Sequence, residues 1–236
     1  MNPDEIAVLT AAPCRGKVLV RQRSAVAYRR LRVQQMQESR TRIASTRVVD
    51  EIDRARAQEY ALLATLLSRS PDAQMIQRLA MLRGDASPIG VAHAALGQAA
   101  ARADETSAAR EYFDLFAGLG QEALLPYASH YLTGSLYGRP LARLRETFQN
   151  LGIEKAAGHS EPEDHVVFLC EIMAGLVGGD IAGPPGADRE FFESHLAPWI
   201  RRFFVDLERA RSADFYACVG ALGRIFIDLE TEALSA

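Results

Sequence analysis

Apolar residues recur every three or four positions along most of the chain after residue 46. The first such segment carries its apolar residues at Val49, Ile52, Ala55, Leu62, Leu63, Leu66 and Leu67. This spacing places the side chains on one face of a helix with 3.6 residues per turn. Ser70-Pro71 follows, and proline cannot continue a helix. The pattern therefore predicts a long amphipathic helix that ends before this pair.

The same periodicity predicts further helices, and no stretch alternates apolar and polar residues as a half-buried strand would. The expected segments are about 72–83, 88–102, 104–117, 139–150, 191–207 and 215–229. Asp104 and Ser212 are placed to cap two of these helices, and Pro140 falls in a permitted first turn. Pro198 predicts a kink or a restart. We expect an all-α bundle of about nine to eleven helices.

Length and composition are typical of a globular chain. With 236 residues, 48% of them hydrophobic, the chain can bury one large core. No apolar run approaches the roughly 18 residues that a membrane span needs, and no secretory signal is found, so no stable membrane insertion is expected. The three cysteines (Cys14, Cys170 and Cys218) are scattered, which disfavours a disulfide framework. These features predict a cytoplasmic protein.

Charge divides the chain into a basic arm and an acidic body. Residues 1–50 hold ten Lys and Arg against four Asp and Glu, whereas the remainder holds 17 against 26. Residues 1–46 lack helical periodicity, so we expect a disordered extension there and a helical domain over residues 47–236. The arm could also be a cationic segment that contacts nucleic acid or the acidic body, or a reading frame that truly begins at Met36. An acidic body suits a cationic peptide and repels nucleic acid.

Tyr28-Arg29-Arg30-Leu31 in this arm has the paired arginines of an export signal. Polar residues follow the pair where such a signal has its apolar region. We therefore do not interpret it as an export signal.

The run Ser160-Glu161-Pro162-Glu163-Asp164-His165 holds three carboxylates and an imidazole. Ser160 and Glu163 have the spacing of a capping box, and proline is tolerated in a first turn, so a helix is predicted to start at Ser160. Its exposed stripe would comprise Glu161, Asp164, His165, Phe168 and Ile172. Carboxylates in a first turn are also favoured by the helix dipole alone, which is the structural alternative to a site.

The segment Glu161-Pro162-Glu163-Asp164-His165 resembles the E-P-x-D-H signature of the TorD/DmsD family. Other segments resemble that family in the same order: Tyr112-Phe113-Asp114-Leu115-Phe116, Leu125-Pro126-Tyr127-Ala128-Ser129, His195-Leu196-Ala197-Pro198-Trp199 with Phe203, and Phe215-Tyr216. Leu119 stands where many members have proline, and residues 1–46 have no counterpart.

The resemblance implies a non-enzymatic cytoplasmic chaperone for molybdenum-containing redox enzymes. Its partners would be a twin-arginine signal peptide and the apo-form of the enzyme's catalytic subunit, and it would assist cofactor loading before export. The residues expected to bind the signal peptide are Glu161, Pro162, Asp164, His165, Phe168, Tyr112, Phe116, Tyr127 and Trp199. The resemblance also implies a monomer or a domain-swapped homodimer, with a hinge in residues 152–159. A weak contact with molybdopterin cofactor or guanine nucleotide is implied by resemblance only.

Two other classes of function stay open at the level of sequence. One is an enzyme that uses the Glu161–His165 cluster for acid–base or metal chemistry, and the other is a helical regulator whose basic arm binds nucleic acid. The only lysines, Lys17 and Lys155, lie in no phosphate-binding loop. The G-x-G-x-x-A run at 118–123 follows a predicted helix rather than a strand. His159 and His165 lack the spacing of helical metal ligands, so we expect no bound metal.

Overall fold

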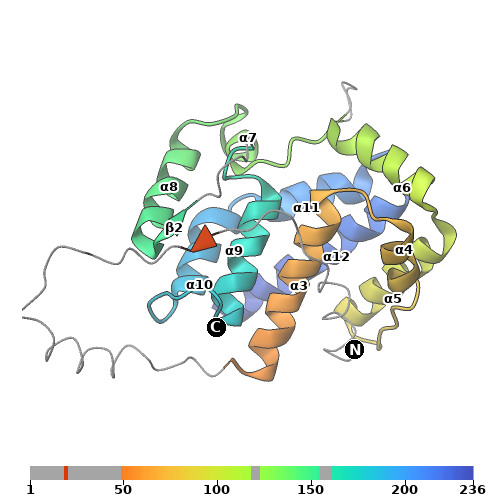
Figure 1. Cartoon of the computed structure of the whole chain (residues 1–236), viewed down its shortest axis with the longest axis horizontal. Helices are drawn as coiled ribbons and strands as arrows, with labels where there is room; N and C mark the ends of the chain where they lie inside the picture. Colours follow the sequence, from red (N-terminus) through yellow and green to blue (C-terminus); the bar gives the residue numbers. More distant parts are fainter. Residues whose placement is uncertain (1–18, 21–48, 118–122, 155–160, 236) are drawn as a thin grey trace, which may run out of the picture.

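The computed structural model describes residues 19–20, 49–117, 123–154 and 161–235 (Figure 1). Over these residues the chain is all-α, as the sequence predicts, apart from one two-stranded pairing. The helices are α3 (Glu51–Ser68), α4 (Ala73–Leu79), α5 (Pro88–Arg102), α6 (Glu105–Tyr112), α7 (Ala128–Thr133), α8 (Arg139–Leu151), α9 (Val166–Gly178), α10 (Ala187–Phe191), α11 (Ile200–Arg209) and α12 (Phe215–Ser235). Wider π-helical turns, η1 (Phe113–Ala117) and η2 (Phe192–Leu196), extend α6 and α10.

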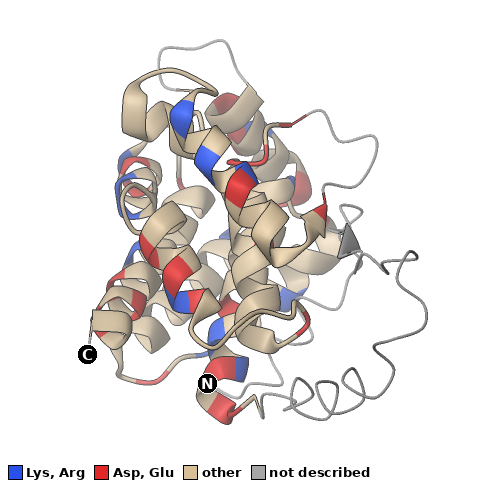
Figure 2. Ribbon diagram, turned by 90° about the vertical axis from the view of Figure 1, so that its left-hand side faces the viewer, with Lys and Arg blue, Asp and Glu red and all other residues tan. Residues whose placement is uncertain are grey.

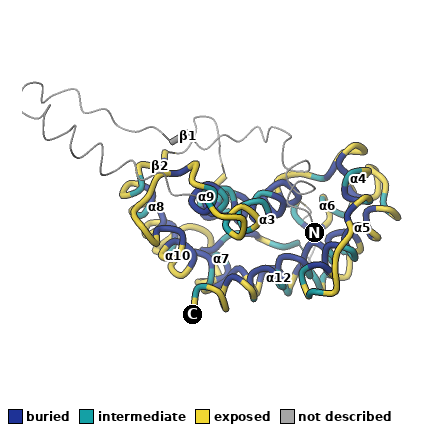
Figure 3. Tube along the Cα trace, turned by 90° about the horizontal axis from the view of Figure 1, so that it is seen from below, coloured by how far each residue is buried: buried dark blue, intermediate teal, exposed yellow. Residues whose placement is uncertain are grey.

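Two helix pairs form the centre of the bundle: α3 lies against α9, and α11 lies against α12. Figure 3 shows buried residues along the sides of α3, α9 and α12 that face one another. The second half of the apolar stripe predicted for the first helix faces this core, since Leu62, Leu63 and Leu66 are at most 1% exposed. The first half does not, because Ile52 is 72% exposed. Within the described residues, no helix has both the length and the apolarity that crossing a membrane requires.

Two glycines set how closely α11 and α12 approach each other. A Cβ atom on Gly220 would lie 2.4 Å from the backbone nitrogen of Glu208, and one on Gly223 would lie 2.3 Å from the Phe204 ring. No real Cβ contact is this short, so larger residues would push the helices apart. The close approach buries Phe203 and Phe204 completely.

A buried ionic cluster ties α3 to α12 and α10. The Arg56 guanidinium donates to both carboxylate oxygens of Glu230, at 2.7 and 2.9 Å, and the Tyr60 hydroxyl donates to the same carboxylate. Asp53 and Asp188 also lie within ion-pair distance of Arg56. Because Glu230 is 2% exposed, this bidentate pairing is what makes burial of its charge tolerable. Figure 2 shows basic and acidic residues intermixed along the helices.

Strand β1 (Leu19–Val20) pairs antiparallel with β2 (Ile153–Glu154), the two residues that follow α8. The register places Leu19 opposite Glu154 and Val20 opposite Ile153. These are the only residues of the basic arm that the structure describes. The predicted disorder of residues 1–46, and the division of the chain at residue 46, therefore stay predictions.

Several predicted helix bounds are confirmed, and others are corrected. Helix α5 has the predicted bounds, and Asp104 caps α6 through the backbone N–H of Ser107. Helix α4 is shorter than predicted and ends at Leu79, after which Met81 and Leu82 donate to the carbonyls three residues before them, in tighter turns. The helical region 191–207 does break, between η2 and α11, where Pro198 lies. The predicted cap at Ser212 is wrong, because a residue on another helix caps α12.

That cap is Glu111 on α6. Its carboxylate accepts hydrogen bonds from the backbone N–H groups of Asp214, Phe215 and Tyr216, at 2.6 to 3.2 Å. The first N–H groups of a helix have no partner within the helix, and a carboxylate also favours the positive end of the helix dipole. Glu111 therefore anchors the longest helix of the bundle from about a hundred residues away in sequence.

Replacing Glu111 with Ala should lower the free energy of unfolding by about 2 kcal/mol, because three N–H groups lose a charged acceptor. Denaturant unfolding followed by circular dichroism measures this. Glu146→Ala, at an exposed position on α8, is the matched control and should stay within about 0.5 kcal/mol of wild type. Equal stability of the two variants would show that the cap contributes nothing.

Candidate functional site

The site is built where two segments distant in sequence exchange backbone hydrogen bonds. The N–H of Ala128 donates to the carbonyl of Asp164 at 3.0 Å, and the N–H of Val166 donates to the carbonyl of Pro126 at 2.8 Å. These bonds form an antiparallel bridge between Tyr127 and His165. The start of α7 and the start of α9 are therefore fixed against each other.

The side chain of Asp164 strengthens this junction from inside. It is 1% exposed, and its Oδ2 accepts a hydrogen bond of 2.8 Å from the backbone N–H of Ser129, in the first turn of α7. The hydroxyl of Ser129 in turn accepts from the N–H of Tyr137, whose φ of 71° is unusual for a residue other than glycine. Asp164 was expected on an exposed stripe that contacts a peptide. The structure instead makes it a buried anchor of α7.

The predicted start of the helix at Ser160 is wrong, because α9 begins at Val166. Ser160 itself lies outside the described residues. His165 is the N-cap, since its Nδ1 accepts from the N–H of Val167 at 3.2 Å. Residues 161–165 form turns because their backbone pairs with the segment before α7. This pairing between distant segments replaces the local capping box that the sequence suggests.

A pocket of about 180 Å³ opens beside this junction. Its lining residues are Leu67, Tyr112, Phe116, Ala117, Leu125, Pro126, Tyr127, Glu161, His165 and Val166. Five of the nine predicted site residues thus meet in one cavity, namely Tyr112, Phe116, Tyr127, Glu161 and His165. They come from α6, η1 and the two paired segments, which the sequence alone does not bring together.

Tyrosine hydroxyls hold the aromatic wall of the pocket against the end of α3. Tyr112 donates to the carbonyl of Leu67, and Tyr216 donates to the carbonyl of Leu66, both at 3.2 Å. The last carbonyls of a helix lack partners within the helix, so these bonds satisfy them. The rings of Tyr112, Phe116 and Tyr216 pack together, with centroids 5.0 to 5.8 Å apart.

Glu161 is the acidic group of the pocket. It is exposed, and its carboxylate accepts a hydrogen bond from the hydroxyl of Tyr127. Burial raises the pKa of Tyr127, and the bond to Glu161 and its negative charge raise this pKa further. Burial and the charge of Glu161 also raise the pKa of Tyr112. Both tyrosines therefore keep their protons and act as hydrogen-bond donors, Tyr127 to Glu161 and Tyr112 to the carbonyl of Leu67.

His165 contributes a neutral ring. Burial lowers the pKa of His165 to about 4, although the charges of Glu161 and Asp164 act in the opposite direction. Its Nδ1 accepts the hydrogen bond that caps α9, which the protonated ring could not do. The Tyr127 ring meets the His165 ring edge to face, with centroids 5.0 Å apart. His165 thus stabilises the start of α9 and supplies an uncharged wall to the pocket.

The remaining predicted site residues lie outside the pocket. Pro162 accepts a hydrogen bond from the N–H of His165 within the turn, and Phe168 lies half-buried on α9. Trp199 is 2% exposed and donates its indole N–H to the carbonyl of His195, so it belongs to the core. Ile172, predicted on the exposed stripe, is 1% exposed.

The sequence reasoning missed the apolar rim of the pocket. Leu125 lines the cavity and is 40% exposed. Phe113 follows Tyr112 in sequence and is 59% exposed, but it does not line the cavity. Both residues stand in segments that were singled out only for their aromatic and proline positions.

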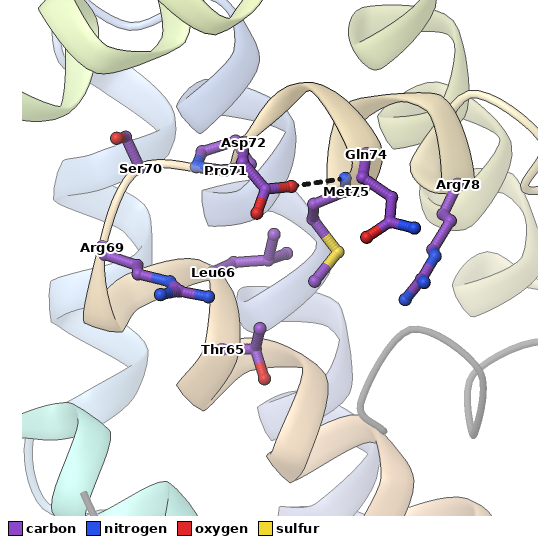
Figure 4. Close-up of a pocket in the computed structure, with 9 residues that line it drawn as sticks. All are labelled: Thr65, Leu66, Arg69, Ser70, Pro71, Asp72, Gln74, Met75 and Arg78. Atoms are coloured by element: carbon purple, nitrogen blue, oxygen red, sulfur yellow. Dashed lines mark hydrogen bonds between the residues drawn. The ribbon is translucent and has the colours of Figure 1, made fainter. Parts of the chain in front are cut away.

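A second pocket, of about 30 Å³, lies where α3 passes into α4 and has room for little more than one water molecule. Figure 4 shows Asp72 capping α4 through the N–H of Met75, with Gln74 and Arg78 side by side along this helix. This small pocket is explained by the helix cap. Within the described residues, no group of three or more His, Cys, Asp or Glu side chains is placed to hold a metal ion.

Comparison with known proteins identifies the family of this chain. A family model described as "Nitrate reductase delta subunit" matches residues 83–205, which is just over half of the chain. The match includes most of the pocket and all of the Glu161–His165 segment. The chain therefore belongs to this family, and the resemblance to the TorD/DmsD family is confirmed.

Curated relatives carry chaperone names. The chain is 26% identical over 135 residues to the chaperone protein TorD of Vibrio cholerae, a match that covers 53% of this chain and 61% of the relative. It is 26% identical over 208 residues to the TorD of Shewanella loihica, covering 78% and 95%. It is 27% identical over 114 residues to a protein of Haemophilus influenzae named as Tat proofreading chaperone DmsD, covering 48% and 54%.

A solved structure also resembles this one. It is described as a redox enzyme maturation protein from Archaeoglobus fulgidus, with 22% sequence identity and a TM-score of 0.48, and the match covers 73% of this chain and 93% of that one.

Replacing Asp164 with Ala should lower the free energy of unfolding by about 1.5 to 3 kcal/mol, because the N–H of Ser129 loses a charged acceptor in a buried position. Asp164→Asn, which keeps an acceptor oxygen, should lose less. Asp180→Ala, at an exposed position after α9, is the control. A loss below about 0.5 kcal/mol for Asp164→Ala would mean that this carboxylate does not anchor α7.

His165 should make the protein less stable as the pH falls from about 6.5 to about 4. The pKa is lowered in the folded state, so the unfolded chain takes up the proton first, and the lost stability is on the order of 3 kcal/mol. In His165→Asn, where asparagine still caps the helix, this part of the pH dependence should disappear. Thermal unfolding over that pH range measures the slope, and His130→Asn should keep the wild-type slope. A His165→Asn slope equal to wild type would contradict the lowered pKa.

Proposed function

We propose that this protein is a cytoplasmic chaperone, not an enzyme, that binds the twin-arginine signal peptide of a molybdenum-cofactor oxidoreductase precursor. It retains the precursor while the cofactor is loaded and releases it for export. Family membership and the chaperone names of its relatives support a role in the maturation of redox enzymes. The signal peptide as the bound group is inferred from the chemistry of the pocket.

The single observation that carries the proposal is a carboxylate at the edge of an aromatic pocket. An arginine guanidinium is planar, donates paired hydrogen bonds to a carboxylate and stacks on aromatic faces. Glu161 offers the carboxylate, and Tyr112, Phe116 and Tyr127 offer the rings. All of these groups are neutral or negative, so the pocket has nothing to repel a cation.

The size of the pocket also favours a side chain over a cofactor. Its volume of about 180 Å³ is below the 300 to 1,000 Å³ typical of small-molecule sites. One arginine side chain is a more suitable occupant than a pterin or a guanine nucleotide, whose contact with this chain stays a prediction from resemblance. The exposed Leu125, which lines the pocket, then offers apolar surface for the run that follows the arginines of such a peptide.

The other expectations about assembly rest on resemblance. The proposed partner beyond the signal peptide is the apo-form of the molybdoenzyme's catalytic subunit. A monomer and a domain-swapped homodimer are both compatible with the proposal. Of the proposed hinge at residues 152–159, the structure describes only residues 152–154. A nucleic-acid role for the basic arm has no support from the described part of the chain.

Reversing the charge at Glu161 tests the proposal. Glu161→Lys should weaken binding of a peptide with two adjacent arginines by at least tenfold, about 1.4 kcal/mol, because an attraction becomes a repulsion. A peptide with glutamates in place of the arginines should bind this variant better than it binds wild type. Isothermal titration calorimetry on the four combinations measures the coupling.

Two controls separate this result from general effects. Glu190→Lys, at an exposed position on α10, changes the net charge equally and should leave affinity within about twofold. A peptide with two lysines should bind wild type more weakly than the arginine peptide, since lysine cannot form the bidentate contact. Additive effects of the two charge reversals would mean that the peptide binds elsewhere.

A further inference from the structure

The basic arm is attached to the body near the pocket. Strand β1, its only described part, pairs with β2, and Ile153 of β2 is buried in the core at 6% exposed. Strand β2 directly follows α8 (Figure 1), whose Arg145 donates to both carboxylate oxygens of Glu163, the closer contact being 2.8 Å. Glu163 belongs to the Glu161–His165 segment. The arm is therefore held by a part of the body that is tied to the segment carrying the pocket carboxylate.

Chain length limits how far this attachment can lie from the pocket. Seven residues lead from Glu154 to Glu161, and an extended chain spans at most about 3.6 Å per residue, so these two residues lie within about 25 Å of each other. Leu19 is paired with Glu154 across a strand spacing of about 5 Å. Leu19 therefore lies no more than about 30 Å from Glu161, whatever path residues 155–160 take.

The arm is long enough to bring arginine to that carboxylate. Ten residues lead from Leu19 to Arg29, a reach of about 35 Å before the side chain itself is counted. At the other end of the arm, Val49 lies beside the C-terminal end of α9, because a Cβ atom on Gly179 would be 3.2 Å from its Cγ2. Helix α9 is about 20 Å long and begins at the pocket, whereas nineteen residues lead from Arg30 to Val49. Both attachments therefore permit Arg29 and Arg30 to reach the pocket.

The sequence of the arm is complementary to the pocket. Residues 21–46 hold seven arginines and one acidic residue, Glu38. Arg29 and Arg30 are the only adjacent arginines among them, and polar residues follow this pair where an export signal has its apolar run. The pair therefore has the cationic half of the proposed ligand and lacks the apolar half.

We propose that Arg29 and Arg30 occupy the Glu161 pocket of their own chain and compete there with the signal peptide of a client enzyme. The inference rests on the proposed function, because it requires a pocket that accepts a guanidinium. One guanidinium pairs with the Glu161 carboxylate and lies against the rings of Tyr112 and Tyr127.

Attachment to the same chain makes a weak contact effective. Two groups joined by a tether meet at an effective concentration of about a millimolar, so a contact that two separate molecules would rarely form is occupied much of the time. When the arm fills the pocket in about two-thirds of the molecules, the apparent affinity for a competing peptide falls about threefold.

A client displaces the arm because it carries what the arm lacks. The apolar run that follows its arginines packs on Leu125 at the edge of the pocket, whereas the arm offers Arg32-Val33-Gln34-Gln35 at the same position. A peptide with arginines alone gains nothing over the arm. The arm thereby raises the selectivity of the site for complete signal peptides.

Removing the arginine pair tests the competition. The probe is a synthetic peptide in which Arg-Arg precedes about ten apolar residues, titrated calorimetrically into the full chain. Arg29→Gln/Arg30→Gln should bind this peptide at least about threefold more tightly than wild type. Arg40→Gln/Arg42→Gln is the matched control, because it removes the same charge from the same arm and leaves the adjacent pair intact. Its affinity should stay within about 1.5-fold of wild type.

The outcomes separate this inference from the proposed function. If neither wild type nor Arg29→Gln/Arg30→Gln binds the probe, or if Glu161→Lys leaves binding unchanged, the proposed function is contradicted and the inference with it. If binding depends on Glu161 but wild type and both arginine variants bind alike, only the arm contact is overturned. Equal tightening by both arginine variants also overturns it, since net charge then accounts for the effect.

Proteolysis tests the contact without any peptide. Trypsin cleaves after arginine, and a residue held in a pocket is cleaved only from the fraction of molecules in which it is released. Cleavage after Arg29 and Arg30 should be at least about threefold slower in wild type than in Glu161→Lys, whose pocket repels the arm. Cleavage after Arg40 and Arg42 should proceed equally in both proteins. Mass spectrometry of the early fragments gives the rates, and equal rates after Arg29 and Arg30 would overturn the inference even where the probe binds.

Discussion

The buried carboxylate of Asp164 determines where a pocket can form in this fold. Its side chain holds the N–H of Ser129, and its backbone carbonyl holds the N–H of Ala128. Together these bonds place the segment before α7 against the segment before α9. Only then does the Tyr127 hydroxyl reach the Glu161 carboxylate beside the cavity. The buried Asp164 therefore positions the exposed Glu161.

The rest of the bundle keeps this junction in place. Helix α9 packs along α3, and α3 is tied to α12 through the pairing of Arg56 with Glu230. At its other end α3 presents the carbonyls of Leu66 and Leu67 to two tyrosine hydroxyls. Helix α3 thus supports both walls of the pocket. It packs against α9, and the carbonyls at its C-terminal end orient the tyrosines of the aromatic wall. Because these contacts are buried, the pocket is a preformed feature rather than one that a ligand must create.

Local signals in the sequence predict the structure well, and contacts between distant residues explain the errors. Helix α5 and the Asp104 cap follow from nearby residues, so both could be predicted. The start of α9 and the cap of α12 could not, because Pro126 and Glu111 lie far away in sequence. The signature segment was correctly located, but its residues could not be assigned separate roles. Whether Glu161 or Asp164 faces solvent depends on a backbone pairing that no periodicity reveals.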